Sequence, residues 1–185
     1  MWKAMPWFAA FVLLAVGGCA QDSARQTEQR AASPDDTLAE TRSLFVIERS
    51  KNANTVHYDA QLTPDGRLNP EEPVIAYYVM LAEDGRRKEL NWVEKKMAYG
   101  FDIRPDASVD GYSMAMVAAP GRVITVREDR GAVRAELVID GRPAVLEKMY
   151  IEASDGFPWP TVHYVELHGR DIQTGEMRFE KVVPK

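Results

Sequence analysis

Cysteine and histidine are scarce in this sequence. Cys19 is the only cysteine among 185 residues, and the three histidines are His57, His163 and His168. A single cysteine excludes both an intramolecular disulfide and a cysteine-rich metal site. His163 and His168 are five residues apart, so they point to opposite faces of a regular strand. His57 could meet one of them across strands, but two ligands do not define a zinc site. We therefore expect all three histidines to be ordinary strand residues and no metal to be bound.

The sequence also lacks the motifs of common enzymes. It contains no G-x-S-x-G, H-E-x-x-H, Walker or G-x-G-x-x-G motif. Asp102, Asp106 and Asp110 recur at every fourth position, which differs from the spacing of a calcium loop and predicts a solvated loop. We therefore expect no cofactor and a non-catalytic role. An enzyme that uses paired carboxylates such as Glu48 and Glu147 is the third and least supported alternative.

An excess of positive charge is absent as well. The chain has 23 basic and 28 acidic residues, a net charge of −5. Binding to nucleic acid requires a strongly basic face, so we expect no nucleic-acid partner. From residue 42 onward the chain retains 23 acidic and 20 basic residues, a net charge of −3. We therefore do not expect the domain to attract a macromolecular partner mainly through long-range electrostatic steering.

The first 19 residues, MWKAMPWFAAFVLLAVGGC, have the pattern of a secretory signal peptide. Lys3 precedes an uncharged apolar stretch over residues 4–16, and small residues follow. The stretch is shorter than the ~20 residues of a membrane-spanning helix. Its end, residues 16–19, resembles the lipobox of bacterial lipoproteins, which implies cleavage after residue 18 and a membrane anchor on acylated Cys19. An ordinary signal peptide with a chance cysteine is the alternative.

The residues after Cys19 indicate a tether. In lipoproteins of Gram-negative bacteria, Asp after the lipidated cysteine retains the protein at the inner membrane. Ala20 stands there instead, so the resemblance implies the outer membrane, with the protein facing the periplasm. Residues 20–41 contain no aromatic residue and too little apolar surface to fold. We therefore predict a signal peptide over 1–18, a lipid-anchored flexible tether over 19–41 and one β-rich domain over 42–185.

The domain has the pattern of short strands separated by turns. Segments rich in β-branched and aromatic residues cover 43–49, 54–62, 73–82, 111–118, 122–128, 132–139, 142–153, 161–171 and 176–183. Asp-Gly pairs, which favour tight turns, stand at 65–66, 84–85, 110–111, 140–141 and 155–156. The spacing predicts a mainly β fold: an antiparallel β-barrel or β-sandwich of about eight to ten strands with one short helix.

Three segments allow finer predictions. In 88–98, residues Leu90, Val93 and Met97 recur at helical spacing, which predicts the short helix. Both faces of 73–82 are apolar, which predicts a central strand buried on both sides. In 142–153 charged and apolar residues alternate, as in a half-exposed strand.

The most unusual polar stretch is Glu48-Arg49-Ser50-Lys51-Asn52-Ala53-Asn54. A hairpin tip with these donors could bind a carboxylate, a phosphate or a sugar, because Arg offers a planar fork and Lys a point charge. A plain polar turn is the alternative, since Asn and Ser favour turns.

This stretch also carries a resemblance. Together with PVIAYYVMLAEDGRRKELNWVEKKMAYGFDI, the segment ERSKNANTVHYDAQL resembles an uncharacterised family of bacterial secreted or lipid-anchored domains of unknown function. The resemblance covers residues 43–183 and is most specific at ERSKNAN and EKKMAYG. It implies that the two stretches share one feature. We therefore predict one cationic, amide-rich site of Arg49, Lys51, Asn52, Asn54, Lys96 and Tyr99.

Two functions follow from these observations. The first is a lipid-anchored envelope protein with a non-catalytic role, which binds a small anionic or polar ligand or an envelope component. The second is a structural or interaction protein of the envelope that binds another protein through a sheet edge. A pocket with convergent donors distinguishes the first, and an exposed apolar patch distinguishes the second.

Overall fold

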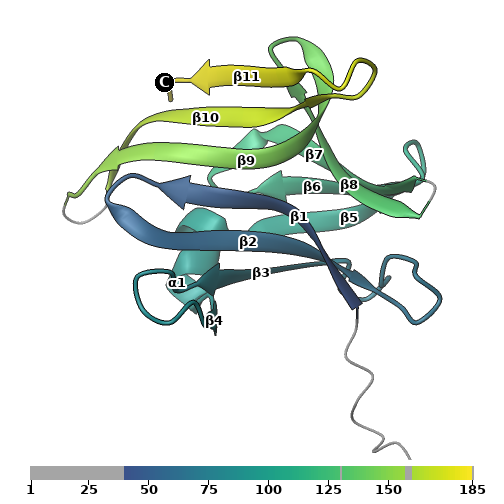
Figure 1. Cartoon of the computed structure of the whole chain (residues 1–185), viewed down its shortest axis with the longest axis horizontal. Coiled ribbons are helices and arrows are strands. Elements are labelled where there is room, and N and C mark those ends of the chain that lie inside the picture. The colour runs from purple at the N-terminus through teal and green to yellow at the C-terminus, as the bar shows by residue number, and fades with distance from the viewer. Residues whose placement is uncertain (1–39, 130, 157–159, 185) are drawn as a thin grey trace, which may run out of the picture. The chain divides into compact units, whose positions relative to one another are not determined.

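The computed structural model describes residues 40–129, 131–156 and 160–184, and these form a mainly β fold (Figure 1). The predicted signal peptide, Cys19 and most of the predicted tether lie outside the described residues. The first strand begins at Glu40, two residues before the predicted start of the domain. No helix among the described residues has both the length and the apolar character needed to cross a membrane.

Eleven strands form one curled sheet. The first four are β1 (Glu40–Arg49), β2 (Asn52–Leu62), β3 (Val74–Val79) and β4 (Arg87–Glu89). A short helix follows, α1 (Trp92–Glu94), which continues as the wider π-helical turn η1 (Lys95–Tyr99). The next four strands are β5 (Phe101–Asp106), β6 (Gly111–Met116), β7 (Ala119–Asp129) and β8 (Ala132–Ile139). The last three are β9 (Arg142–Ser154), β10 (Thr161–Asp171) and β11 (Met177–Val182).

Strand β9 is the point at which the sheet divides. Along one edge it pairs with β10, which in turn pairs with β11. Along the other edge, residues 142–145 pair with β8 and residues 148–151 pair in parallel with β1. Two arms therefore diverge from β9. The first arm is β1–β4 and the second arm is β5–β8 (Figure 1).

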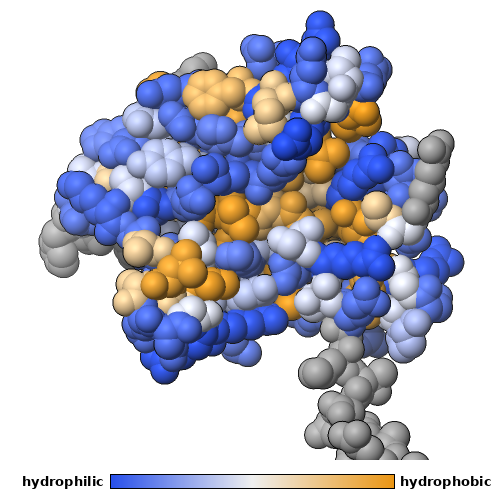
Figure 2. All heavy atoms as spheres, in the orientation of Figure 1, coloured by the Kyte–Doolittle hydropathy of each residue, from blue (hydrophilic) through white to orange (hydrophobic). Residues whose placement is uncertain are grey.

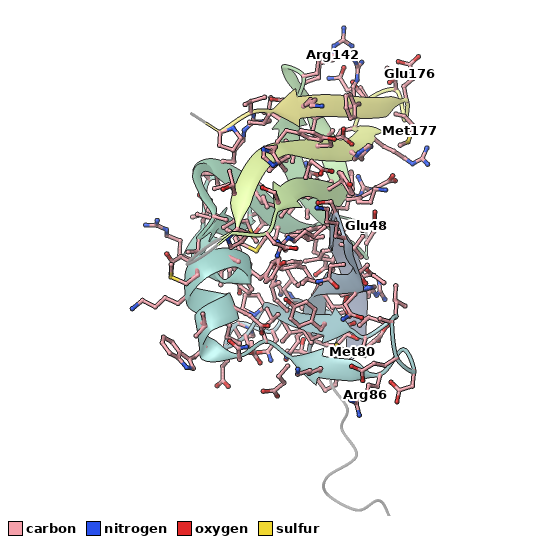
Figure 3. The ribbon with its side chains drawn as sticks, turned by 90° about the vertical axis from the view of Figure 1, so that its left-hand side faces the viewer. Glu48, Met80, Arg86, Arg142, Glu176 and Met177 are labelled. Carbon is pink, nitrogen blue, oxygen red and sulfur yellow. The ribbon has the colours of Figure 1, made fainter. Side chains whose placement is uncertain are left out.

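Aromatic side chains connect the two arms. Phe45 of β1 stacks on Tyr58 of β2 at 4.5 Å between ring centroids, and Tyr58 lies 6.0 Å from Phe101 of β5. The Tyr58 hydroxyl donates a 2.7 Å hydrogen bond to the backbone oxygen of Tyr99. Phe45 and Tyr58 are fully buried, so the core lies between the arms and is closed on one side by the helix (Figure 3).

Turn chemistry confirms part of the sequence interpretation. Asp140 and Gly141, with φ of 50° and 72°, form the two-residue connection between β8 and β9. Positive φ at both positions is the geometry for which Asp-Gly is suited. The predicted mainly β fold with one short helix is confirmed, although the sheet contains one parallel pair, β1 with β9, and eleven strands.

The prediction for segment 73–82 was wrong. Strand β3 ends at Val79 and lies next to the end of the first arm, with only the three-residue β4 beyond it. Its residues after Val74 are half-buried. The apolar pattern was misleading because Tyr77, on the outer face, is stabilised by polar contacts: its hydroxyl donates to the Asp59 carboxylate.

The helix and the aspartate-rich loop also differ from prediction. The helix begins at Trp92 rather than at residue 88, because Arg87–Glu89 pair with β3 as β4. The wide π turn shifts the helical phase, so Tyr99 becomes buried while Met97 is 47% exposed. The segment with Asp102 and Asp106, predicted as a loop, is the edge strand β5, in which polar residues and a proline are tolerated.

Candidate functional site

A groove of about 650 Å³ lies between the free ends of the two arms and the helix. One wall is the edge of β3 with β4, a second is the start of β5, and the third is the helix. In Figure 3 the helix stands on one side of the molecule and the strands of the first arm on the other. The lining consists of Gln61, Glu72, Val74, Ile75, Ala76, Tyr77, Arg87, Glu89, Leu90, Trp92, Lys95, Lys96, Tyr99, Gly100, Phe101, Asp102 and Val117.

The start of the helix is fixed by a reciprocal cap. The Asn91 side chain accepts a hydrogen bond from the Glu94 backbone N–H at 2.9 Å. The Glu94 carboxylate accepts one from the Asn91 backbone N–H at 2.7 Å. This capping box satisfies two amides that the first turn leaves free. It thereby holds Trp92, whose side chain is 73% exposed, at the rim of the groove.

The end of the helix depends on a glycine. A Cβ atom at Gly100 would lie 1.8 Å from the backbone oxygen of Lys95. Only glycine therefore lets the chain leave the π turn and enter β5 directly. This close approach places Lys95, Lys96 and Tyr99 on one wall of the groove.

Charged side chains stand on every wall of the groove. Lys95 and Lys96 on the helix are exposed, and within the described part of the chain neither has a carboxylate within salt-bridge distance. The strand walls contribute Arg87, Glu89 and Asp102, and Glu72 before β3 also lines the groove. The helix wall is therefore a positive surface with free donors.

Tyr77 and its neighbours form a polar cluster on the wall of β3. The Tyr77 hydroxyl donates a 2.5 Å hydrogen bond to Asp59 Oδ2, and the Arg87 guanidinium lies 3.6 Å above the Tyr77 ring. Burial and the Asp59 carboxylate raise the pKa of Tyr77 to about 12. Asp59 Oδ1 is buried and has no hydrogen-bond partner among the described residues. Tyr77 is thus held protonated and rigid beside the groove.

A second tyrosine joins the helix to the first arm. Tyr78 meets the ring of Tyr99 edge-on at 5.8 Å. Burial, followed by the proximity of Tyr99 and Glu94, raises the pKa of Tyr78 well above its usual value, while the charge of Arg49 opposes the shift. Tyr99 therefore packs against Tyr78, and the charge of Arg49 acts on the same hydroxyl.

The six predicted site residues do not all lie at the groove. Lys96 and Tyr99 line the groove. Arg49 ends β1, pairs with the exposed Asp155 at 3.3 Å, and has a buried Nε without a described partner. The other three, Lys51, Asn52 and Asn54, lie at the β1–β2 hairpin and do not line the groove.

Most polar groups of the hairpin bind backbone. Ser50 Oγ donates to the Ala153 oxygen and accepts from the Ala153 N–H, which fastens the hairpin to β9. Asn52 accepts from the Asn54 N–H, and the Asn54 side chain accepts from the Ala82 N–H after β3. The polar-turn interpretation accounts for these side chains, because each satisfies a backbone group of the hairpin itself or of a neighbouring segment.

The remaining reactive side chains do not converge. His57 contacts Thr55 and stacks against Tyr77, His163 contacts Ser154, and His168 lies against Phe179. Within the described ranges no three His, Cys, Asp or Glu side chains form a cluster suited to a metal ion.

The two glutamates proposed as a catalytic pair each bind a different cation. Glu48 pairs with Lys148 at 3.2 Å and Glu147 with Arg170 at 2.7 Å. Glu48 lies on the face of β1 away from the helix (Figure 3). That face combines hydrophilic residues with a hydrophobic band across its middle (Figure 2).

Trp92, Lys95, Arg87 and Tyr77 were missed by sequence reasoning. One signal was available: Trp92 falls outside the apolar stripe of its helix, so its ring had to be exposed or bound. The contribution of Arg87 and Tyr77 depends on the pairing of β3 with β4, which local sequence does not reveal.

Comparison with known proteins identifies a family and no function. No curated protein and no solved structure matches the chain. Residues 45–181, about three quarters of the chain, match the family described as Domain of unknown function (DUF4833). This range includes the second half of β1 and all of β2 to β10, and with them the hairpin and the groove. The chain therefore belongs to the DUF4833 family.

Proposed function

We propose that this protein is a non-catalytic binding module that holds an anionic or polar ligand in the groove. The observation that carries the proposal is that an exposed Trp92 and two lysines without a salt bridge to any described residue, Lys95 and Lys96, share one wall of a groove of about 650 Å³. Binding sites for small molecules commonly have volumes of about 300–1,000 Å³ and a few convergent polar groups.

The chemistry of the walls defines the ligand class. Each lysine ammonium offers three donors to a carboxylate or phosphate. The exposed Trp92 ring offers a flat apolar surface next to them, and Tyr99 and Phe101 extend this surface inward. A suitable ligand therefore combines an acidic group with an apolar or flat portion.

We also propose that the module is anchored in the bacterial envelope through acylated Cys19. The proposal rests on the pattern of residues 1–19 and on the lipobox resemblance. It places the groove in the periplasm, where the ligand is a small acidic molecule or an acidic group of an envelope component.

A titration followed by nuclear magnetic resonance tests the binding proposal. The probes are glutarate, which carries two carboxylates, and glutaramide, its neutral amide counterpart. We expect glutarate to shift the backbone amide signals of Trp92, Lys95 and Lys96 saturably and glutaramide to shift them less. Shifts spread evenly over the domain, or equal shifts with both probes, would contradict an anion-selective groove.

A further inference from the structure

The strands from β6 to β11 curl around a second, smaller pocket. These strands are consecutive neighbours in the sheet, and each of them contributes at least one residue to the lining. The pocket has a volume of about 180 Å³. Among the described residues none lines both this pocket and the groove, so the pocket is a separate site.

The curled sheet around the pocket is open along one seam, between β7 and β11. Strand β8 pairs with β7 only at residues 125–129, and among the described strands β11 pairs with β10 alone. An ion pair spans the seam: the Arg122 guanidinium of β7 donates two hydrogen bonds to the Glu180 carboxylate of β11, one of them at 3.1 Å. Because Arg122 and Val182 of β11 both line the pocket, the pocket lies behind this seam.

The pocket is apolar from its floor to its mouth. Ala119 and Pro184 are exposed at the mouth, and Val165 and Val182 are half-buried along the walls. The floor consists of five buried apolar residues, Met116, Ile124, Leu137, Met149 and Leu167. Such a cavity offers water no hydrogen-bond partners, and apolar cavities of about 150 Å³ stay dry and bind guests of the size of benzene.

One charged side chain stands among the described lining residues, and its charge is already compensated. Arg122 is paired with Glu180, and Glu180 also accepts a 2.9 Å hydrogen bond from the Asp140 N–H. The ion pair is therefore a neutral polar feature at the seam, next to an apolar interior. A ligand that suits both parts has an apolar end and a polar head.

We propose that this second pocket holds the end of the unbranched hydrocarbon chain of an amphiphile. The described lining contains no aromatic ring for stacking, and apart from Arg122 no side chain that forms a strong hydrogen bond. Met116 and Met149 are flexible and adapt to a chain. Sites for whole small molecules have volumes of about 300–1,000 Å³, so only the chain end enters and the head stays near the Arg122–Glu180 pair.

The first test compares 1-hexanol with 1,6-hexanediol on the full-length protein. Both have the same chain, but the diol buries a hydroxyl group whichever end enters. We expect 1-hexanol to shift the methyl signals of Met116 and Met149 saturably in nuclear magnetic resonance spectra, and the diol to bind roughly tenfold more weakly. Equal binding of the two alcohols, or no saturable shift at either methionine, would overturn the proposal.

A pair of variants tests the location. Ala119 is the cross-strand partner of Met116, so its side chain lies on the same face, and a larger side chain there covers the mouth. Ala119→Trp should abolish saturable binding of 1-hexanol. Ala107→Trp, at an exposed position in the β5–β6 turn that does not line the pocket, should bind like the wild type. Equal affinities of the two variants would overturn the pocket as the site, and the comparison of alcohols stands whatever the stability of either variant.

Two lipid probes identify the source of the chain. Lysophosphatidylcholine below its critical micelle concentration supplies single chains, and phosphatidylcholine vesicles present such chains in a bilayer. Saturable shifts of Met116 and Met149 with the lysolipid alone would assign the pocket to a free amphiphile, and shifts with both probes to a bilayer lipid. If neither probe shifts these signals although 1-hexanol does, the amphiphile is excluded as the ligand.

Discussion

At the scale of single residues, the stretches ERSKNAN and EKKMAYG are first of all structural. In ERSKNAN, Ser50 and Asn54 fasten the β1–β2 hairpin to β9 and to the segment after β3. In EKKMAYG, Glu94 caps the helix and Gly100 permits its end. These roles are backbone requirements, which explains why a polar turn and a cationic site were both reasonable interpretations of the sequence. The structure assigns Lys96 and Tyr99 to the groove and leaves the hairpin amides outside it.

Gly100 provides the sharpest residue-scale prediction for stability. Gly100→Ala should lower the free energy of unfolding by about 1–3 kcal/mol, because the new Cβ collides with the Lys95 backbone and forces the helix end to shift. Gly121→Ala is the matched control, since a Cβ there meets no atom within 4 Å. Chemical denaturation measures both. Equal stability of the two variants would show that the π turn accommodates the new Cβ at no cost, and would contradict this prediction.

Lys51 provides a prediction of the opposite sign. Its φ of 59° is a left-handed conformation that costs an L-residue about 1–2 kcal/mol. Lys51→Gly should therefore raise the midpoint of thermal unfolding, whereas Lys51→Ala should not. If both substitutions lower the midpoint, the Lys51 side chain itself contributes to stability.

At the scale of elements, alternation and turn chemistry predicted the strands well. The segments 54–62, 132–139 and 161–171 each coincide within two residues with a strand. Strands β4 and β5 were missed because they are polar edge strands, whose pairing depends on distant partners rather than on their own apolar pattern. The helix boundary was misplaced for a related reason, since β3 recruits Arg87–Glu89 as a strand.

The hydrogen bond between Tyr77 of β3 and Asp59 of β2 should make the stability of the fold decrease at alkaline pH. Tyr77 has a pKa of about 12 in the folded protein and about 10 when unfolded. Because the folded pKa is the higher one, Tyr77 contributes stability that is complete below pH 10 and is lost as the pH rises towards 12. Denaturation across this range should show a steeper fall for the wild type than for Tyr77→Phe. Parallel curves would contradict the assignment.

At the scale of the whole molecule, the described domain is a pair of arms whose free ends leave one groove open beside the helix. Neither arm has this property alone, because the groove walls come from β3, β5 and the helix. Local sequence could predict Lys96 and Tyr99 as neighbours on one helix. It could not predict that β3 and β5, separated by the helix in the chain, would line the same groove.

The proposed anchor is also a property of the whole chain. Cys19→Ser should abolish incorporation of a fatty-acid analogue and release the protein from the membrane fraction, because a lipidated cysteine is the anchor that the pattern of residues 1–19 predicts. Metabolic labelling in a bacterial host measures this. Undiminished labelling of the variant would refute lipidation at Cys19.

The most direct test of the groove as the binding site is the affinity for glutarate in two charge-matched double variants. Lys95→Ala/Lys96→Ala removes two positive charges from the groove. Arg142→Ala/Arg170→Ala removes two from exposed side chains that do not line the groove and that pair with Asp171 and Glu147. We expect an affinity roughly tenfold lower for the lysine variant and nearly unchanged for the arginine variant. Equal loss in both variants would mean that net charge attracts the anion, and would exclude the groove as the binding site.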